Sequence, residues 1–192
     1  MNKKHIIAVE GIDGAGKSTL IALLREEFPI LLYQRTKKGK WLDKIVSTKF
    51  MKKHYMIQVP IYLLLSYKNY ISFIIKSSKN KLIIMDRCFL SNICYFYPKA
   101  LKSKKILDFI MKFEIKLLPS CIFILDVDPI VGHKRDNEKK ELGWMINTRK
   151  AYLEASNSQL LSQFNIKIVE FNQSIESKYQ CIVNEIGRGM EW

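Results

Sequence analysis

Short apolar runs alternate with longer amphipathic segments along the chain. Five of the runs are nearly continuous in Ile, Val, Leu and Phe, at residues 5–10, 30–34, 81–86, 121–127 and 166–171. Such runs are typical of strands that are covered on both faces, as in a parallel sheet. The other segments have helical spacing, at residues 17–28, 39–53, 56–78, 102–118, 142–164 and 174–186. This alternation predicts an α/β fold in three layers, with a five-stranded, mostly parallel sheet flanked by helices.

Nothing in the pattern divides the chain into separate domains. Its 192 residues are 48% hydrophobic, which is enough for one core, so we expect a single domain over residues 1–192. The most polar stretch between elements is residues 136–141, and we predict a small lid at about residues 134–143. The longest apolar candidate for a membrane helix, residues 57–75, is interrupted by Pro60, Lys68 and Asn69. With no signal-peptide pattern at the N-terminus, this favours a cytoplasmic protein without a membrane partner.

The chain is strongly basic, with a formal net charge of +14. A basic surface attracts polyphosphates and occurs in many nucleic-acid-binding proteins. Here 26 of the 32 basic residues are Lys, and they are spread over nearly every predicted helix rather than gathered in one tract. We therefore interpret the charge as a general positive field that attracts nucleotides, and nucleic-acid binding is the less favoured interpretation.

A glycine-rich loop follows the first predicted strand. The pattern G-x-x-x-x-G-K-[ST] is met at residues 11–18, between a strand and a helix, which is the context that this phosphate-binding motif requires. Glycines let successive backbone N–H groups converge on anionic oxygens, and the start of a helix favours phosphate. Lys17 can reach the β and γ phosphates, and Ser18 can ligate Mg²⁺. The residues assigned to the triphosphate of ATP are Gly11, Asp13, Gly14, Ala15, Gly16, Lys17, Ser18 and Thr19.

Other features narrow the class of phosphate-loop protein. No Asn-Lys-x-Asp motif for reading guanine is present, and the chain is short for a motor or a helicase, so a small ATP-dependent kinase fits best. Asp86 ends a predicted strand at the sheet edge where ligands bind in open α/β folds, so its carboxylate can hold Mg²⁺ or a water of Mg²⁺. Arg87 beside it can clamp a phosphate through two hydrogen bonds.

Four segments match one family of kinases in order and in spacing. Residues 10–19 read E-G-I-D-G-A-G-K-S-T, against a family signature of E-G-x-D-G-x-G-K-S-T. Residues 82–87 match an apolar strand ending in Asp-Arg, and Ser91 and Tyr95 fall at the spacing of D-R-Y-x-x-S-x-x-A-Y-Q. Residues 118–135 match a P-D-x-x-x-x-L-D-V-x-P segment and the arginine that begins a lid. Over nearly its whole length the chain resembles the thymidylate kinases, a branch of the P-loop nucleoside monophosphate kinases.

This resemblance implies phosphorylation of dTMP to dTDP with ATP and Mg²⁺, and it implies a homodimer through helices that pack face to face. The apolar helices expected at residues 56–78 and 102–118 can supply that surface. Asp13 is implied to face the sugar of the acceptor or the metal, and Arg135 to pack on the adenine of the donor or to contact its phosphates. The residues assigned to catalysis are Asp13, Lys17, Arg87 and Arg135. Those assigned to the metal are Ser18 and Asp86. Those assigned to the acceptor are Asp13, Arg35, Lys68, Arg87, Ser91 and Tyr95.

The chain departs from the family pattern mainly on the acceptor side. Phe96 stands where the family has a base-reading Gln, and Lys68 stands where it commonly has an Arg that helps to hold thymidylate. Phenylalanine can stack on a base but cannot hydrogen-bond to it, and lysine lacks the planar fork of arginine. The lid also lacks the second arginine of bacterial members, a role open to Lys134, Lys139, Lys140 or, on the next helix, Arg149.

Three functions therefore stay open at this point. The first is ATP- and Mg²⁺-dependent phosphorylation of a nucleoside monophosphate, most simply dTMP. The second keeps the donor site and changes the acceptor to another nucleotide or to a nucleoside. The third, which is the least favoured, is a nucleotide-binding protein with weak catalysis, suggested by the basic charge and the arginine-poor lid.

Overall fold

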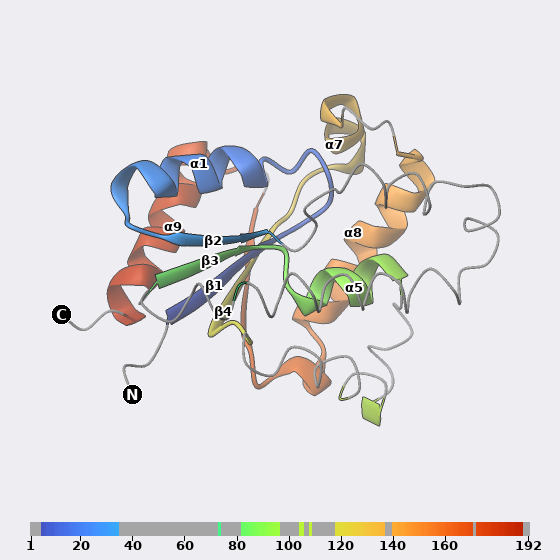
Figure 1. Cartoon of the computed structure of the whole chain (residues 1–192). Helices are drawn as coiled ribbons and strands as arrows, with labels where there is room; N and C mark the ends of the chain where they lie inside the picture. Colours follow the sequence, from blue (N-terminus) through green and yellow to red (C-terminus); the bar gives the residue numbers. More distant parts are fainter. Residues whose placement is uncertain are drawn as a thin grey trace.

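Five parallel strands form one sheet in the order β2-β3-β1-β4-β5 (Figure 1). The computed structural model describes residues 5–34, 73, 82–96, 104, 105, 108, 118–136, 140–170 and 172–189. The strands are β1 (His5–Glu10), β2 (Leu31–Gln34), β3 (Leu82–Asp86), β4 (Cys121–Leu125) and β5 (Asn165–Val169). The predicted α/β class and the five-stranded parallel sheet are thereby confirmed.

Helices cover both sides of the sheet. On one side α1 (Lys17–Glu27) packs beside α9 (Ile175–Gly189), and on the other α5 (Phe89–Phe96) packs beside α8 (Leu142–Ser156), as Figure 1 shows. A shorter helix, α7 (Pro129–Arg135), follows β4 and packs on α8. Apart from polar residues at their ends, the central strands are apolar because both of their faces are covered, and the side chains of Ile7, Ile84 and Phe123 are almost fully buried.

Three helix predictions differ from the structure. The single helix expected over residues 142–164 is wrong, because α8 ends at Ser156 and a separate 3₁₀ turn, η4 (Gln159–Leu161), follows it. Neither α5 nor α7 was expected as a helix. The strand expected over residues 121–127 ends at Leu125, since Asp128 caps α7 by accepting a hydrogen bond from the Ile130 N–H at 2.7 Å.

Several predicted elements cannot be compared with the structure. The helices expected at residues 39–53 and 56–78 lie outside the described residues except for Phe73, and of residues 102–118 only four positions are described. Among the helices that the structure does describe, none combines the length and the apolar character needed to cross a bilayer.

Candidate active site

The glycine-rich loop connects β1 to α1 at the carboxyl end of the sheet. Gly11, Gly14 and Gly16 all have positive φ angles, and Gly16 is the N-cap of α1. These backbone conformations are rare for residues with a side chain, so the glycines allow the loop to wrap around the start of the helix. Ser18 and Thr19 follow in the first turn of α1, and both are exposed. The loop therefore has the shape that the motif predicted.

Helix α7 supports this loop from behind. A Cβ atom added to Gly14 would collide with the carbonyl of Gly132, and one added to Gly132 would lie 2.9 Å from the carbonyl oxygen of Asp13. The two backbones can approach this closely only because both residues are glycines. The sequence analysis did not single out Gly132, since a lone glycine in a short helix has no signal of its own. Its contact joins α7 to the phosphate loop.

Replacing Gly132 with Ala should therefore disturb the phosphate loop. The new methyl group has no space, so we expect a loss of about 1–3 kcal/mol in the free energy of unfolding and a several-fold rise in the KM for ATP. Gly187→Ala in α9 is the matched control, because no atom lies within 4 Å of its added Cβ. That control should be neutral or stabilising, by up to about 1 kcal/mol. Urea denaturation and steady-state kinetics of both variants test this, and equal behaviour of the two would contradict it.

Lys17 lies inside the loop and is buried. Its ammonium group donates to the carbonyl oxygens of Gly11 at 3.1 Å and Ile12 at 2.8 Å. Burial, followed by the positive charge of Arg87, lowers the pKa of Lys17 to about 7, although the negative charges of nearby carboxylates act in the opposite direction. Burying this cation is unfavourable in the free protein, as expected at a site that is completed by an anionic ligand.

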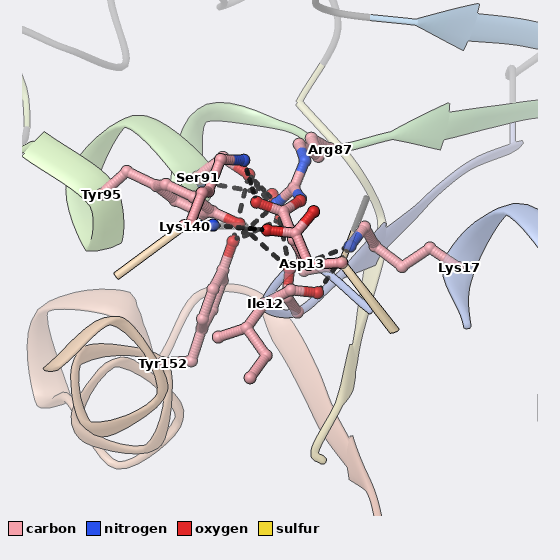
Figure 2. Close-up of polar contacts among 11 residues, drawn as sticks. Ile12, Asp13, Lys17, Arg87, Ser91, Tyr95, Lys140 and Tyr152 are labelled. Carbon is pink, nitrogen blue, oxygen red and sulfur yellow. Dashed lines mark hydrogen bonds and ion pairs between the residues drawn. The ribbon is translucent and has the colours of Figure 1, made fainter. Parts of the chain in front are cut away.

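Asp13 is held between two cations from distant parts of the chain, as Figure 2 shows. Its Oδ1 accepts from Nη2 of Arg87 at 2.5 Å, and its Oδ2 is bound by the ammonium group of Lys140. Burial would raise the pKa of Asp13, but the charges of Arg87, Lys140 and Lys17 outweigh this effect and lower it. Asp13 is therefore a fixed carboxylate, and both of its oxygens are already engaged.

Arg87 is aimed into the site by its backbone. Its φ angle is 72°, the one positive value among the described residues other than glycine, and its N–H donates to the Val9 carbonyl at 3.1 Å. The guanidinium group lies over the ring of Tyr95 at 4.9 Å, and its Nη1 donates to the Gly11 carbonyl at 3.0 Å. Left-handed backbone at a residue with a large side chain is costly and is often found at functional sites.

Glu10 anchors this region from below, a role that the sequence analysis did not assign. The residue is fully buried, and Oε1 accepts from the N–H groups of Cys88 at 2.7 Å and Ser91 at 3.2 Å. Oε2 accepts from the Ser91 hydroxyl at 2.6 Å and the Tyr152 hydroxyl at 2.9 Å. One carboxylate thus ties the end of β1 to the start of α5 and to α8. It thereby fixes the turn that carries Arg87.

Asp86 and Ser18 are the assigned metal ligands. Asp86 ends β3 next to Val9 of β1, and burial raises its pKa although Lys17 and Arg87 act in the opposite direction. Ser18 begins α1 with an exposed side chain. A partly buried carboxylate and a hydroxyl suit Mg²⁺, which is usually held by one or two protein groups together with substrate phosphates and water. The described residues contain no group of three or more His, Cys, Asp or Glu side chains that could hold a metal ion.

The remaining assigned residues lie in different places. Arg149 forms two hydrogen bonds with Asp126, at 2.6 and 2.7 Å, so its guanidinium group is engaged by that carboxylate. Arg135 ends α7, where its charge helps to lower the pKa of Lys178 after the larger effect of burial. Arg35, Lys68 and Lys139 lie outside the described residues. Of Phe96 only the backbone, at the end of α5, is described.

Asn92 is a further candidate that the sequence analysis missed. It is buried on α5 next to Ser91, and no hydrogen-bond partner for its Nδ2 occurs in the described part of the chain. Buried amides are normally paired, and an exception often marks a ligand contact. Only its burial distinguishes it, and burial could not be read from the sequence.

Comparison with known proteins places this site in one family. The family model described as "Thymidylate kinase" matches residues 9–186. The thymidylate kinase of Sulfurimonas denitrificans is 28% identical over 94% of this chain and 98% of its own length, and that of Acholeplasma laidlawii is 27% identical over 94% and 97%.

Solved structures agree with the fold. The thymidylate kinase of Ehrlichia chaffeensis superposes with a TM-score of 0.70 at 16% identity, over 96% of this chain and 99% of that chain. The deoxyadenosine kinase of M. mycoides with bound dATP reaches a TM-score of 0.67 at 16% identity, over 95% and 99%. At these identities both likenesses concern the arrangement of strands and helices.

Proposed function

The chain belongs to the thymidylate kinase family, and we propose that it transfers the terminal phosphoryl group of ATP to dTMP, with Mg²⁺, to give dTDP and ADP. One observation carries this proposal. Lys17 of the phosphate loop and Arg87 of the β3–α5 turn donate to the same carbonyl oxygen, that of Gly11, at 3.1 and 3.0 Å. A cation suited to the donor phosphates and a cation suited to the acceptor phosphate thus meet at one point.

On the donor side we assign the phosphates of ATP to the loop. The N–H groups of residues 11–19 and the ammonium group of Lys17 would hold them, and the start of α1 adds a favourable dipole. Ser18 and Asp86 would hold Mg²⁺, which when bound neutralises charge on the phosphates. Arg135 at the end of α7 is assigned to the adenine or to the donor phosphates, as the family resemblance implies.

On the acceptor side Arg87 binds Asp13 and lies over the ring of Tyr95. Arg87 would clamp the phosphate of dTMP, and Asp13 would accept a hydrogen bond from the sugar. The hydroxyl proton of Ser91 is used by Glu10, so Ser91 contributes by holding the turn before α5. Arg35 and Lys68 keep the acceptor roles that the resemblance implies.

The chemistry follows from positioning and charge. An oxygen of the dTMP phosphate attacks the terminal phosphorus of ATP in line, and the bond to the bridging oxygen of ADP breaks. No general base is needed because the attacking oxygen is already anionic. Lys17, Arg87 and Arg135 would stabilise the charge that spreads over the transferred group.

We also propose that residues 134–143 form a lid over this site and that the chain is a single domain. The Asp136 carboxylate accepts from the Lys140 N–H at 3.1 Å, and this contact supports the lid because it joins two residues of the segment. Such a lid would exclude water from the reaction.

Asn92 is our candidate for reading the base, because Phe96 cannot hydrogen-bond to it. A buried Nδ2 that lacks a partner among the described residues is suited to a carbonyl oxygen. Thymine has such a carbonyl at its 4-position, whereas cytosine has an amino group there.

A homodimer, which the resemblance implies, stays a prediction because most of the helices assigned to its interface lie outside the described residues.

An acceptor panel tests the proposal. ADP release should be measured with ATP, Mg²⁺ and each of dTMP, dUMP, dCMP, dAMP, dGMP, thymidine and deoxyadenosine, and the phosphorylated products identified by chromatography. We expect dTMP to be preferred, dCMP to be rejected and chelation of Mg²⁺ to abolish turnover. Phosphorylation of a nucleoside or a purine nucleotide in preference to dTMP would instead support a kinase with the same donor site and a different acceptor. Tight ATP binding with turnover near background would favour a nucleotide-binding protein.

A further inference from the structure

The lid lysine Lys140 belongs to a closed ring of contacts around Asp13. Asp13 is bound by Arg87, Arg87 lies over Tyr95, and the ring of Tyr95 meets that of Trp144 with 4.8 Å between centroids. Lys140 in turn lies over the ring of Trp144 at 5.5 Å and returns to Asp13. Figure 2 shows Lys140 and Arg87 approaching the Asp13 carboxylate together. The members of the ring come from the phosphate loop, the β3–α5 turn, α5, the lid and α8.

Three interactions hold Lys140 in this place. Its backbone N–H donates to the side chain of Asp136, its ammonium group binds Asp13, and its charge lies over Trp144 one turn further along. The side chain of Lys140 is 32% exposed and that of Asp13 20%, so the pair is screened less than an ion pair on an open surface. Trp144 is itself partly buried against the core. The position of this lysine is therefore set by packing and by charge together.

The carboxylate that Lys140 binds belongs to the acceptor half of the site. Lys17 meets the loop through the Gly11 and Ile12 carbonyls, whereas Lys140 meets it through Asp13, beside Arg87 and Tyr95. With one cation on each oxygen, the Asp13 carboxylate has a fixed plane and retains lone pairs for a hydroxyl group. A carboxylate that is oriented in advance loses less entropy when it accepts a hydrogen bond from a ligand.

We propose that Lys140 is a positioning residue for the acceptor nucleotide, which orients the Asp13 carboxylate toward the sugar of the nucleoside monophosphate. This inference rests on the proposed function and adds a contribution of the lid to acceptor binding. The ring of Trp144 lies under the ammonium group of Lys140 and packs against the ring of Tyr95. The contact of Lys140 with Asp13 gives this lysine a specific role among the lysines of the segment.

The test is a pair of variants of the full chain, Lys140→Met and Lys140→Arg. Lys140→Met should raise the Kd for dTMP, measured by calorimetry without ATP, by about tenfold, as for a lost charge-assisted contact of roughly 1.4 kcal/mol. The KM for ATP should stay within about twofold. Lys140→Arg keeps the charge and should recover most of the affinity. Lys150→Met on the exposed side of α8 removes the same charge and should leave all of these constants unchanged.

A double-mutant cycle shows whether Lys140 acts through Asp13. In an Asp13→Asn background, Lys140→Met should weaken dTMP binding by less than about twofold, because the carboxylate that it orients is gone. Melting temperatures of the free variants show whether each one folds, and Lys140→Gln replaces the Met variant in the series should that one unfold.

Two results would overturn the proposal. One is an unchanged Kd for dTMP in Lys140→Met, and a kcat at least about a hundredfold lower in the same variant would then assign Lys140 to the transferred phosphoryl group. The other is an undiminished effect of Lys140→Met in the Asp13→Asn background. Failure of the wild-type chain to phosphorylate dTMP would count against the proposed function, whereas equal dTMP affinity in wild type and Lys140→Met counts against the role of Lys140 alone.

Discussion

Replacing Lys17 with Met should lower kcat by roughly 10³-fold while the protein stays folded. The ammonium group lies in the loop between two carbonyl oxygens and beside Arg87, where it is placed to meet the phosphates of the donor. Methionine has a similar length and fills the same space without the charge. Steady-state kinetics with ATP and dTMP measure the loss. Lys17→Arg separates charge from shape, and we expect it to stay at least about a hundredfold below wild type because the fork of arginine does not fit the loop. Retention of more than a tenth of wild-type activity by Lys17→Met would contradict the assignment.

The same variant has an expected effect on stability that depends on pH. Because the folded-state pKa of Lys17 is lowered from 10.5 to about 7, the folded protein binds fewer protons than the unfolded chain between these values. The contribution of Lys17 to the free energy of unfolding of the wild-type protein therefore rises with pH between about 7 and 10.5. Lys17→Met lacks this dependence, so it should be more stable than wild type below about pH 7, with the advantage shrinking toward pH 10.5. Urea denaturation of nucleotide-free protein in chelator at several pH values measures the difference.

Replacing Glu10 with Gln should have the largest effect on stability, a loss of about 3 kcal/mol in the free energy of unfolding. The carboxylate accepts four hydrogen bonds on two oxygens, from the N–H groups of Cys88 and Ser91 and from the buried hydroxyls of Ser91 and Tyr152. Glutamine offers one acceptor oxygen and turns an NH₂ group toward the remaining donors. Urea denaturation measures the loss, and kcat/KM should fall as well because the turn that carries Arg87 is released.

Two milder variants test the reason for this effect. Tyr152→Phe removes one of the four donors and should cost about 1 kcal/mol. Glu27→Gln is the matched control, because Glu27 is exposed on α1 and accepts from the Tyr179 hydroxyl of α9, which the amide oxygen of glutamine can also accept, so its change should stay within about 0.5 kcal/mol. If Glu10→Gln and Glu27→Gln were equally stable, the carboxylate of Glu10 would not anchor the site.

The sheet and the phosphate loop could be predicted because their signals are local. A buried parallel strand is apolar throughout, and the loop needs glycine, lysine and a hydroxyl at fixed spacing before a helix. The short helices α5 and α7 were missed because seven or eight residues show too little of the helical period to be recognised. The end of α8 at Ser156 was missed because the apolar spacing continues into the separate turn that follows.

The rest of the site depends on contacts between distant residues. Glu10 looked like the polar end of a strand until its partner Tyr152, 142 positions away, was placed beside it. Lys140 was one of three equivalent lysines in the lid segment, and only the contact with Asp13 distinguishes it. Arg149 looked available to the loop, but it is held by Asp126. Such choices are made by packing, which local spacing does not encode.

The edge-on contact of Trp144 with Tyr95 has a practical consequence. An indole ring that lies between a phenol ring and a lysine ammonium group is a fluorophore whose emission depends on both neighbours. The other two tryptophans, Trp41 and Trp192, lie outside the described residues and can be replaced by phenylalanine. Trp144 is then the single tryptophan of the chain, and it lies at the junction between α5 and α8. Movement at this junction could be followed in real time in stopped-flow experiments without attaching a dye.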